Sequence, residues 1–328
     1  MFSDQASPNG AHCRLLPTNN QPTASAPQQH KRYHLQHGPI DIVADFFGSA
    51  HLIDQAIDVV WKKFQTILAE LAWQLPLLRS GIVNDVCSTE GLLLVGDTAQ
   101  RMVRAVQPFS KDFITPMAAV AGSVADTLLA TIDQLALDKV IINNGGDIAT
   151  RARLGQIINV QLLAPCGVVR LVGLGQEQYG VATSGWSGRS FSFGVADAVT
   201  VVAKSAGAAD AAATMIANQV GDVCDHPAIS RSPANTIKDD TDLGDRLVTT
   251  AVGRLPQNLI RQLLANGAGF AEDCLRSGKI LAASLFLQGE SVIVARATNP
   301  FVLRHTVLKN TVSKNAVLKN TVLPTDKT

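Results

Sequence analysis

The sequence predicts an α+β protein in which mixed or antiparallel sheets pack against helices. Segments with strand-like alternation are interspersed with segments of helical period. Several predicted strands are joined by turns too short to hold a crossover helix, which favours this class over a doubly wound parallel sheet. With 328 residues and 46% hydrophobic side chains, the chain can form one large or two moderate domains with an ample core.

Composition divides the chain into three parts. Residues 1–30 are rich in Pro, Asn, Gln and Ser, and we expect them to be disordered. A single α+β domain is expected over 31–300. Residues 301–328 carry a pentapeptide repeat whose period matches neither a helix face nor a strand, so we expect a solvated tail. The alternative is a basic arm for an acidic partner.

The helices of the central domain are predicted from apolar spacing and from Pro and Gly positions. Residues 49–75 repeat apolar side chains at helical period and end before Pro76. A second helix begins at Thr115-Pro116 and is expected to run to about Leu137, since Pro suits the first helical position. Two further helices, one of them Ala-rich, are expected at 206–219 and 256–277.

Short apolar runs predict the strands. A buried strand, a glycine turn and a returning strand are expected within 139–155. A hairpin is expected around 287–291, and residues 221–245 are expected to form a loop. The remaining strand predictions are 91–96, 168–175, 179–185, 197–203 and 247–252.

Charge and cysteine usage exclude several function classes. Lys plus Arg (28) nearly balances Asp plus Glu (27), so no overall field favours nucleic acid or an anionic membrane. No apolar run is long enough to span a membrane. The five scattered cysteines contain no CxxC pair, and the N-terminus has no secretory signal, so we expect a cytoplasmic protein.

The acidic loop 221–245 contains two clusters of residues that could bind a metal ion. Asp222, Asp225 and His226 form one cluster, and a second consists of Asp239, Asp240 and Asp242. Because nothing in the sequence holds these side chains in a fixed geometry, we favour a solvated acidic loop.

"NNGGDIA", residues 143–149, is the first candidate site. Gly145 and Gly146 would let the backbone approach a phosphate, and Asp147 could bind a cation or a ribose hydroxyl. The same letters also predict an ordinary hairpin turn, and the two interpretations have equal weight.

The second candidate lies on the predicted helix 206–219. Asp210 and Thr214 are four residues apart and therefore share a helix face. A carboxylate and a hydroxyl are hard oxygen ligands that suit Mg²⁺. The alternative is an ordinary packing helix with an acidic residue near its N-terminus.

The third candidate is "TSGWSGRSFSFG", residues 183–194. Thr183 and Ser184 supply hydroxyls, Gly185 supplies exposed backbone, and Arg189 supplies a bidentate phosphate partner. Trp186 could stack on a planar ring or only cover the loop.

Four motifs, in this order along the chain, resemble those of the ApbE superfamily. They are "AGSVAD" (121–126), "NNGGDIA", "ATSG" (182–185) and "ADAAAT" (209–214). The best-known members are Mg²⁺-dependent enzymes that cleave FAD and attach FMN to a threonine of a target protein. The resemblance implies Asp210 and Thr214 as Mg²⁺ ligands. It also implies a nucleotide site that includes Gly145, Gly146, Asp147, Thr183 and Ser184.

The sequence also departs from the motifs of these transferases. They have a catalytic His followed by Asp-Pro-x-Thr-Gly before the metal helix, and the corresponding interval here contains neither His nor Pro. Ala121 stands where they have Lys. Without that His a general base is missing, and His37 is the candidate substitute.

A shorter, uncharacterised branch of the superfamily resembles this chain more closely. That branch shares "HGPIDI" (37–42) and "GRSFSFG" followed by "ADAVTV", and it has been associated with sulfur metabolism. We therefore expect a cytoplasmic protein, with a homodimer as one option, that binds FAD or a related nucleotide with Mg²⁺. The alternatives are an FMN transferase with a substituted base and a non-catalytic scaffold that retains the fold.

Overall fold

The computed structural model describes residues 4–18, 29–81, 94–161, 168–172, 177–221, 224–296, 302–304 and 321–323. The chain divides into two compact units. Unit 1 comprises Met1–Ile157, Val172–Val181 and Lys204–Ala208; unit 2 comprises Ile158–Leu171, Ala182–Ala203 and Ala209–Thr328. Both units are therefore assembled from segments that are distant in the sequence.

Unit 1 contains an antiparallel sheet. In the order given in the next sentence, each strand is hydrogen-bonded to the strand that follows it. The strands are β1 (Gln5–Ala6), β2 (His12–Leu16), β3 (Gln29–His37), β4 (Ile40–Gly48), β5 (Lys139–Asn144), β6 (Asp147–Ala152) and β9 (Gln178–Ser184). Only the first residues of β9 belong to this unit. The expected strand, turn and return within 139–155 are confirmed as β5 and β6.

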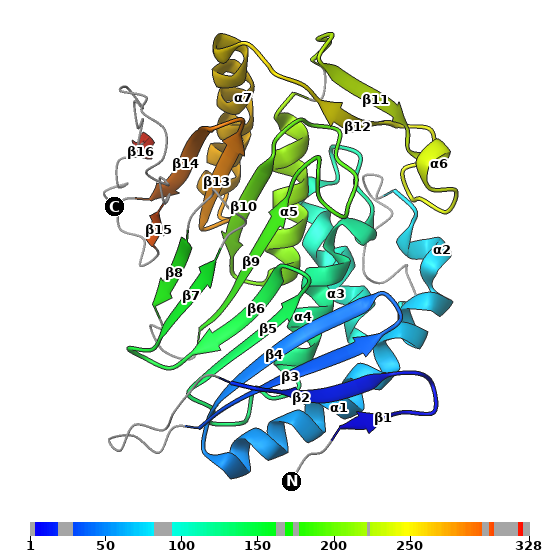
Figure 1. The fold of residues 1–328 in the computed structure, drawn as a ribbon, viewed down its shortest axis with the longest axis vertical. Helices are drawn as coiled ribbons and strands as arrows, with labels where there is room; N and C mark the ends of the chain where they lie inside the picture. The colour runs from blue at the N-terminus through cyan, green and yellow to red at the C-terminus, as the bar shows by residue number, and fades with distance from the viewer. Residues whose placement is uncertain are drawn as a thin grey trace. The chain divides into compact units, whose positions relative to one another are not determined.

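Helices cover one face of this sheet (Figure 1). They are α1 (Ala50–Trp73), α2 (Leu75–Leu78), α3 (Asp97–Val106) and α4 (Val120–Ala130), with the short 3-10 turns η1 (Gln107–Phe109) and η2 (Pro116–Ala119). The core forms where the apolar stripe of α1 meets alternate residues of β3 and β4, because both periods place apolar side chains on one side. This stripe includes Ile53, Ile57, Val60, Phe64 and Ile67.

The helix expected from Thr115-Pro116 to Leu137 is shorter than predicted. It begins with the 3-10 turn at Pro116 and its α-helical part ends at Ala130. Arg151 of β6 donates to the carbonyl of Ile132 at 2.8 Å and pairs with Asp133 at 2.7 Å. The carbonyl oxygen of Ile132 thus accepts a hydrogen bond from a side chain of strand β6. In a longer helix it would accept one from a backbone amide of the same helix.

The expected disorder of residues 1–30 does not hold for residues 12–16. They form β2, which pairs along β3, and Cys13 is buried opposite Leu35. Backbone pairing with strand β3 stabilises this segment within a stretch of polar overall composition, and a count of apolar residues over 1–30 cannot reveal such pairing. Residues 1–3 and 19–28 lie outside the described part of the chain.

Unit 2 contains a second group of paired strands. They occur in the order β10 (Ala198–Ala203), β13 (Ala282–Leu287), β14 (Glu290–Arg296) and β16 (Thr321–Leu323). The first three are antiparallel, whereas β16 is parallel to β14. Strand β16 lies within the repeat tail, and the other residues of the repeat lie outside the described part of the chain. Together with unit 1, these strands and the helices make an α+β fold with mixed sheets, as the sequence predicts.

Two helices support the strands of unit 2. Helix α5 (Ala206–Gln219) has its residues from Ala209 onward in this unit, and α7 (Gln257–Arg276) packs on β13 and β14. Both match the predicted ranges closely. Gly267 lets α7 approach α5, since a Cβ there would lie 2.4 Å from the side chain of Val220 and 3.6 Å from the carbonyl oxygen of Ile216.

Smaller elements complete unit 2. One sheet has the order β15 (Val302–Arg304), β8 (Val168–Val172) and β7 (Ile157–Gln161), whose first residue is counted in unit 1. The predicted loop 221–245 instead contains strand β11 (Ile229–Pro233) and helix α6 (Ala234–Ile237). Strand β11 forms because β12 (Leu247–Val252) pairs with it, a tertiary contact that local composition does not encode. Of the predicted strand 91–96, residues 91–93 lie outside the described part.

Candidate functional site

The "NNGGD" motif forms the hairpin turn between β5 and β6. Asn144 and Asp147 are paired across it, and Gly145 and Gly146 have φ of +62° and +115°. Such positive φ values at both central residues are typical of a two-residue hairpin turn. The backbone amide of Gly146 donates to Asn143 Oδ1 at 2.7 Å. The hairpin interpretation is thereby confirmed, and ligand binding by Gly145, Gly146 and Asp147 stays a prediction.

Asn144 connects this turn to helix α4. Its side chain is 6% exposed, and its Nδ2 donates to the carbonyl oxygen of Ala121 at 3.1 Å. The turn is therefore held in place by a buried hydrogen bond as well as by its own strands.

The "AGSVAD" motif anchors the first turn of α5 within unit 1. Asp126, 2% exposed, accepts from the amides of Ala206 at 2.9 Å and Gly207 at 2.8 Å. Gln178 of β9 donates to the same carboxylate at 2.7 Å. Burial raises the pKa of Asp126, while these hydrogen bonds act in the opposite direction. The first backbone amides of α5 have no acceptor within the helix, and two of them thus donate to the Asp126 side chain.

Two glycines make this anchoring possible. A Cβ on Gly122 would lie 2.3 Å from the carbonyl oxygen of Ala206, and one on Gly180 would lie 2.1 Å from that of Ser205. Both positions therefore require glycine for close backbone approach. The sequence analysis noted Gly122 and Asp126 only as parts of a motif. A structural role could have been suspected because Asp126 is the single charged residue in the stretch 120–130.

Helix α5 carries Asp210 and Thr214 in unit 2. Both side chains are half-buried, whereas nearly all of the alanine-rich remainder of the helix is buried. Asn218, four residues further on, continues the same face. Asp210, Thr214 and Asn218 form what we call the polar stripe of α5.

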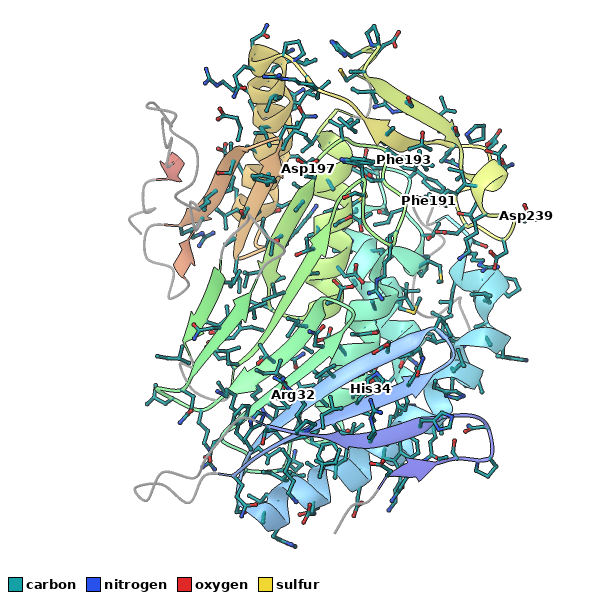
Figure 2. The ribbon with its side chains drawn as sticks, in the orientation of Figure 1. Arg32, His34, Phe191, Phe193, Asp197 and Asp239 are labelled. Atoms are coloured by element: carbon teal, nitrogen blue, oxygen red, sulfur yellow. The ribbon has the colours of Figure 1, made fainter. Side chains whose placement is uncertain are left out.

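The polar stripe holds the segment that follows the "TSG" motif. Asn218 Oδ1 accepts from the amide of Phe193 at 2.9 Å and from the hydroxyl of Ser192 at 3.2 Å. A Cβ on Gly194 would lie 1.9 Å from the carbonyl oxygen of Ala217 on α5. The structure thus joins two of the predicted motifs, the hydroxyl-rich segment and the Asp210 helix, within unit 2. The two phenylalanines of the segment, Phe191 and Phe193, are labelled in Figure 2.

The hydroxyls and glycine at the end of β9 are themselves well packed. Thr183 Oγ1 lies 2.8 Å from Thr200 Oγ1 of β10, and Ser184 is half-buried. Gly185 is buried, and a Cβ there would lie 2.4 Å from the carbonyl oxygen of Asp197. The expectation of exposed backbone at Gly185 is therefore wrong, because the strand that follows packs directly against it. Arg189 is exposed, as a phosphate partner must be.

Trp186 is oriented by a carboxylate. Its indole Nε1 donates to Asp197 Oδ1 at 3.1 Å, and the other carboxylate oxygen accepts from the backbone amide of Gln288 at 2.6 Å. The half-buried ring is thus restrained by the hairpin between β13 and β14, which the sequence did not indicate.

His37, the candidate base, lies in the core of unit 1. The alternation of β3 places it on the same side as Tyr33 and Leu35, and it is 6% exposed. Its Nε2 lies 3.1 Å from the carbonyl oxygen of Asn9, and its ring centroid lies 6.2 Å from that of Phe64 on α1. A base that acts on a bound nucleotide must reach the ligand, so this burial does not favour His37 in that role.

Side chains of the acidic region 221–245 take part in ordinary local contacts. His226 accepts a backbone hydrogen bond through Nδ1 at 3.1 Å, and Lys238 lies 3.8 Å from Asp240. Within the described ranges, no group of three or more His, Cys, Asp or Glu side chains is arranged to hold a metal ion. Asp222 lies outside those ranges.

The α+β fold and the four motifs in their order define an ApbE-like protein. Residues 23–293 match the family described as AbpE bacteria, and the chain belongs to this family. None of the helices that the structure describes has the length and apolar character needed to cross a membrane.

Curated relatives are UPF0280 proteins of archaea. The chain is 40% identical over 124 residues to one from Methanopyrus kandleri, a match that covers 37% of this chain and 48% of that protein. It is 44% identical over 115 residues to one from Methanocaldococcus jannaschii, covering 32% and 44%. A match with a Methanococcus maripaludis protein is 37% identical over 171 residues and covers 45% and 69%. The chain thus spans about half the length of the first two relatives.

Solved structures with a distant likeness include two flavin transferases. The apo form of the flavinyl transferase ApbE from Pseudomonas stutzeri has a TM-score of 0.38 at 12% identity, covering 90% of this chain and 95% of that one. The flavin transferase ApbE from Vibrio cholerae has a TM-score of 0.36 at 12% identity, covering 82% and 97%.

Proposed function

We propose that this chain binds a flavin or a related nucleotide together with Mg²⁺, and that Asp210 and Thr214 are the protein ligands of the metal. The observation that supports this is the polar stripe of α5. On a helix that is otherwise almost wholly buried, Asp210 and Thr214 remain half-accessible, and Asn218 holds the hydroxyl-rich segment against the same helix face. The class of ligand comes from the motif resemblance to the ApbE superfamily.

The donor set suits the proposed ion. Mg²⁺ usually takes one or two protein oxygens and completes its shell with water and substrate phosphate. A carboxylate and a hydroxyl one helical turn apart provide such a partial shell and leave room for a diphosphate. Arg189 is exposed in the segment tied to the same helix and would pair with a phosphate. Nucleotide binding by Gly145, Gly146 and Asp147, which lie in unit 1, stays a separate prediction from the motif resemblance.

Isothermal titration of FAD, FMN and ADP, each with and without Mg²⁺, tests this proposal. We expect Mg²⁺-dependent binding of FAD, and we expect Asp210→Asn to weaken it by roughly tenfold or more because a charged ligand becomes neutral. Asp58→Asn makes the same change at an exposed position of α1 and should leave binding unaltered. Equal affinities for the wild type and Asp210→Asn would exclude the metal assignment.

A second measurement separates binding from catalysis. Chromatography of FAD incubated with the protein and Mg²⁺ would reveal released FMN if the chain cleaves the diphosphate. The missing His and the burial of His37 lead us to expect binding without release. Release of FMN would favour the transferase alternative, and no binding at all would favour a scaffold that retains the fold.

We further propose a cytoplasmic role in sulfur or redox metabolism, on the basis of the resemblance to the shorter branch. A deletion strain that grows equally well on sulfate and on reduced sulfur sources would contradict the sulfur assignment.

A further inference from the structure

A second polar site lies in unit 1, on the face of the sheet that points away from helix α1. In β2 and β3 the buried residues Cys13 and Leu35 are paired and face the core. Because side chains alternate along a strand, the residues on either side of them point to the opposite face. These residues are His12, Arg14, His34 and Gln36, and the first two pair directly with Gln36 and His34.

These four side chains line a hollow in the surface. It has a volume of about 390 Å³, and the segment that contains β1 contributes Asp4, Gln5 and Ala6 to its lining. This volume is in the range of small-molecule sites in proteins, roughly 300 to 1,000 Å³. Figure 2 labels His34 next to Arg32 along β3.

The donors of the hollow suit an oxyanion. Arg14 carries a guanidinium fork that matches the oxygens of a phosphate, and within the described part of the chain its side chain has no ion-pair partner. The imidazole of His12 and the amide of Gln36 add further nitrogen donors. His34 is oriented by Asp41, whose Oδ1 lies 3.0 Å from its Nε2.

Two carboxylates limit what else can enter. Asp4 lines the hollow, and one of its oxygens accepts the backbone amide of Leu15 at 3.3 Å. Asp41 is directly opposite Gln36 on β4. These charges repel a polyanion such as a nucleic acid, whereas they can accept hydrogen bonds from hydroxyl groups. The hollow is also larger than a single phosphate group needs.

We propose that this hollow binds a small phosphate monoester that carries hydroxyl groups, with its phosphate held by Arg14 and its organic part next to the rim carboxylates. The site is separate from the proposed flavin site, since none of its lining residues belongs to the four motifs.

Titration calorimetry of the full chain with glycerol 3-phosphate and with inorganic phosphate tests the proposal. We expect saturable binding that is tighter for the monoester than for the free anion. Arg14→Met should weaken it roughly tenfold or more, and Arg14→Lys, which keeps the charge but loses the fork, should weaken it less. Arg104→Met, at an exposed arginine of α3 in the same unit, is the matched control and should leave binding unchanged.

Several outcomes would overturn the proposal. They are the absence of saturable binding, an affinity that Arg14→Met does not change, and equal affinity for both probes, which would indicate a site for free phosphate. If Arg14→Met fails to fold, Gln36→Ala, at another exposed position of the hollow, replaces it with the same expected direction. Asp210→Asn should not alter monoester binding, so this result is independent of the flavin proposal.

Discussion

Two glycine-rich stretches of this chain look alike as sequences but need their glycines for different reasons. At the β5–β6 turn, Gly146 has a φ of +115° and nothing within 4 Å of where its Cβ would be. In the segment after β9, Gly194 is buried, and its Cβ would lie 1.9 Å from a backbone oxygen of α5. The first glycine is required by backbone conformation and the second by space. Stability measurements can separate these two requirements.

The largest effect is expected from Gly194→Ala. The added methyl group meets the backbone of Ala217, which cannot rotate away, so we expect a loss of about 3 kcal/mol in the free energy of unfolding. Denaturant unfolding measures it. Gly269→Ala, on α7 where nothing lies within 4 Å, is the control and should stabilise by about 0.5 to 1 kcal/mol. A loss below about 1 kcal/mol for Gly194→Ala would show that the segment is not packed on α5.

Asn218→Leu should have the next largest effect. It removes the buried acceptor of the Phe193 amide and the Ser192 hydroxyl. We expect this loss to lower the free energy of unfolding by about 2 kcal/mol. Denaturant unfolding of Asn218→Leu and of Gln219→Ala, at the adjacent half-buried position, checks this. If the two variants were equally stable, the polar stripe would not hold the segment.

At the hairpin turn, Gly146→Ala should lower the free energy of unfolding by about 1 kcal/mol. An L residue is strained at the φ of Gly146 even though there is space for its Cβ. Gly145→Asn is the matched comparison, since its φ of +62° is one that Asn accepts readily, and we expect almost no change. Thermal unfolding of the two variants gives the difference. A larger loss at Gly145 than at Gly146 would contradict the turn geometry.

The smallest effect on stability is expected from Trp186→Phe, about 0.5 to 1 kcal/mol for one lost hydrogen bond to Asp197. A second variant, Trp186→Ala, removes the ring and tests whether it is a stacking surface. If it only covers the loop, FAD affinity should stay the same, because no contact with the ligand is lost. A fall in affinity of roughly tenfold would instead assign the ring to the nucleotide site.

The four motifs differ in how much of their role could be predicted. The hairpin at Gly145 and Gly146 follows from local preference, because only the flanking strands and the turn residues are involved. An isolated acid such as Asp126 can be suspected of a structural role, but its partners could not be predicted, because Ala206 and Gly207 are 80 and 81 residues away in the sequence. His37 was proposed as a base from its chemistry, and strand alternation instead directs it into the core.

The sequence by itself determined the fold class, the helix at 206–219 and the pairing of Asp210 with Thr214 on one helix face, because these depend on period and spacing within a few residues. Only the tertiary structure decided that residues 12–16 form a strand, that Asn218 holds the segment around Phe193, and that Asp126 satisfies the first amides of α5. Each of these depends on hydrogen-bond partners that distant parts of the chain supply. A backbone group or a buried polar side chain forms hydrogen bonds with whichever partner the fold brings near. The local sequence pattern does not identify that partner.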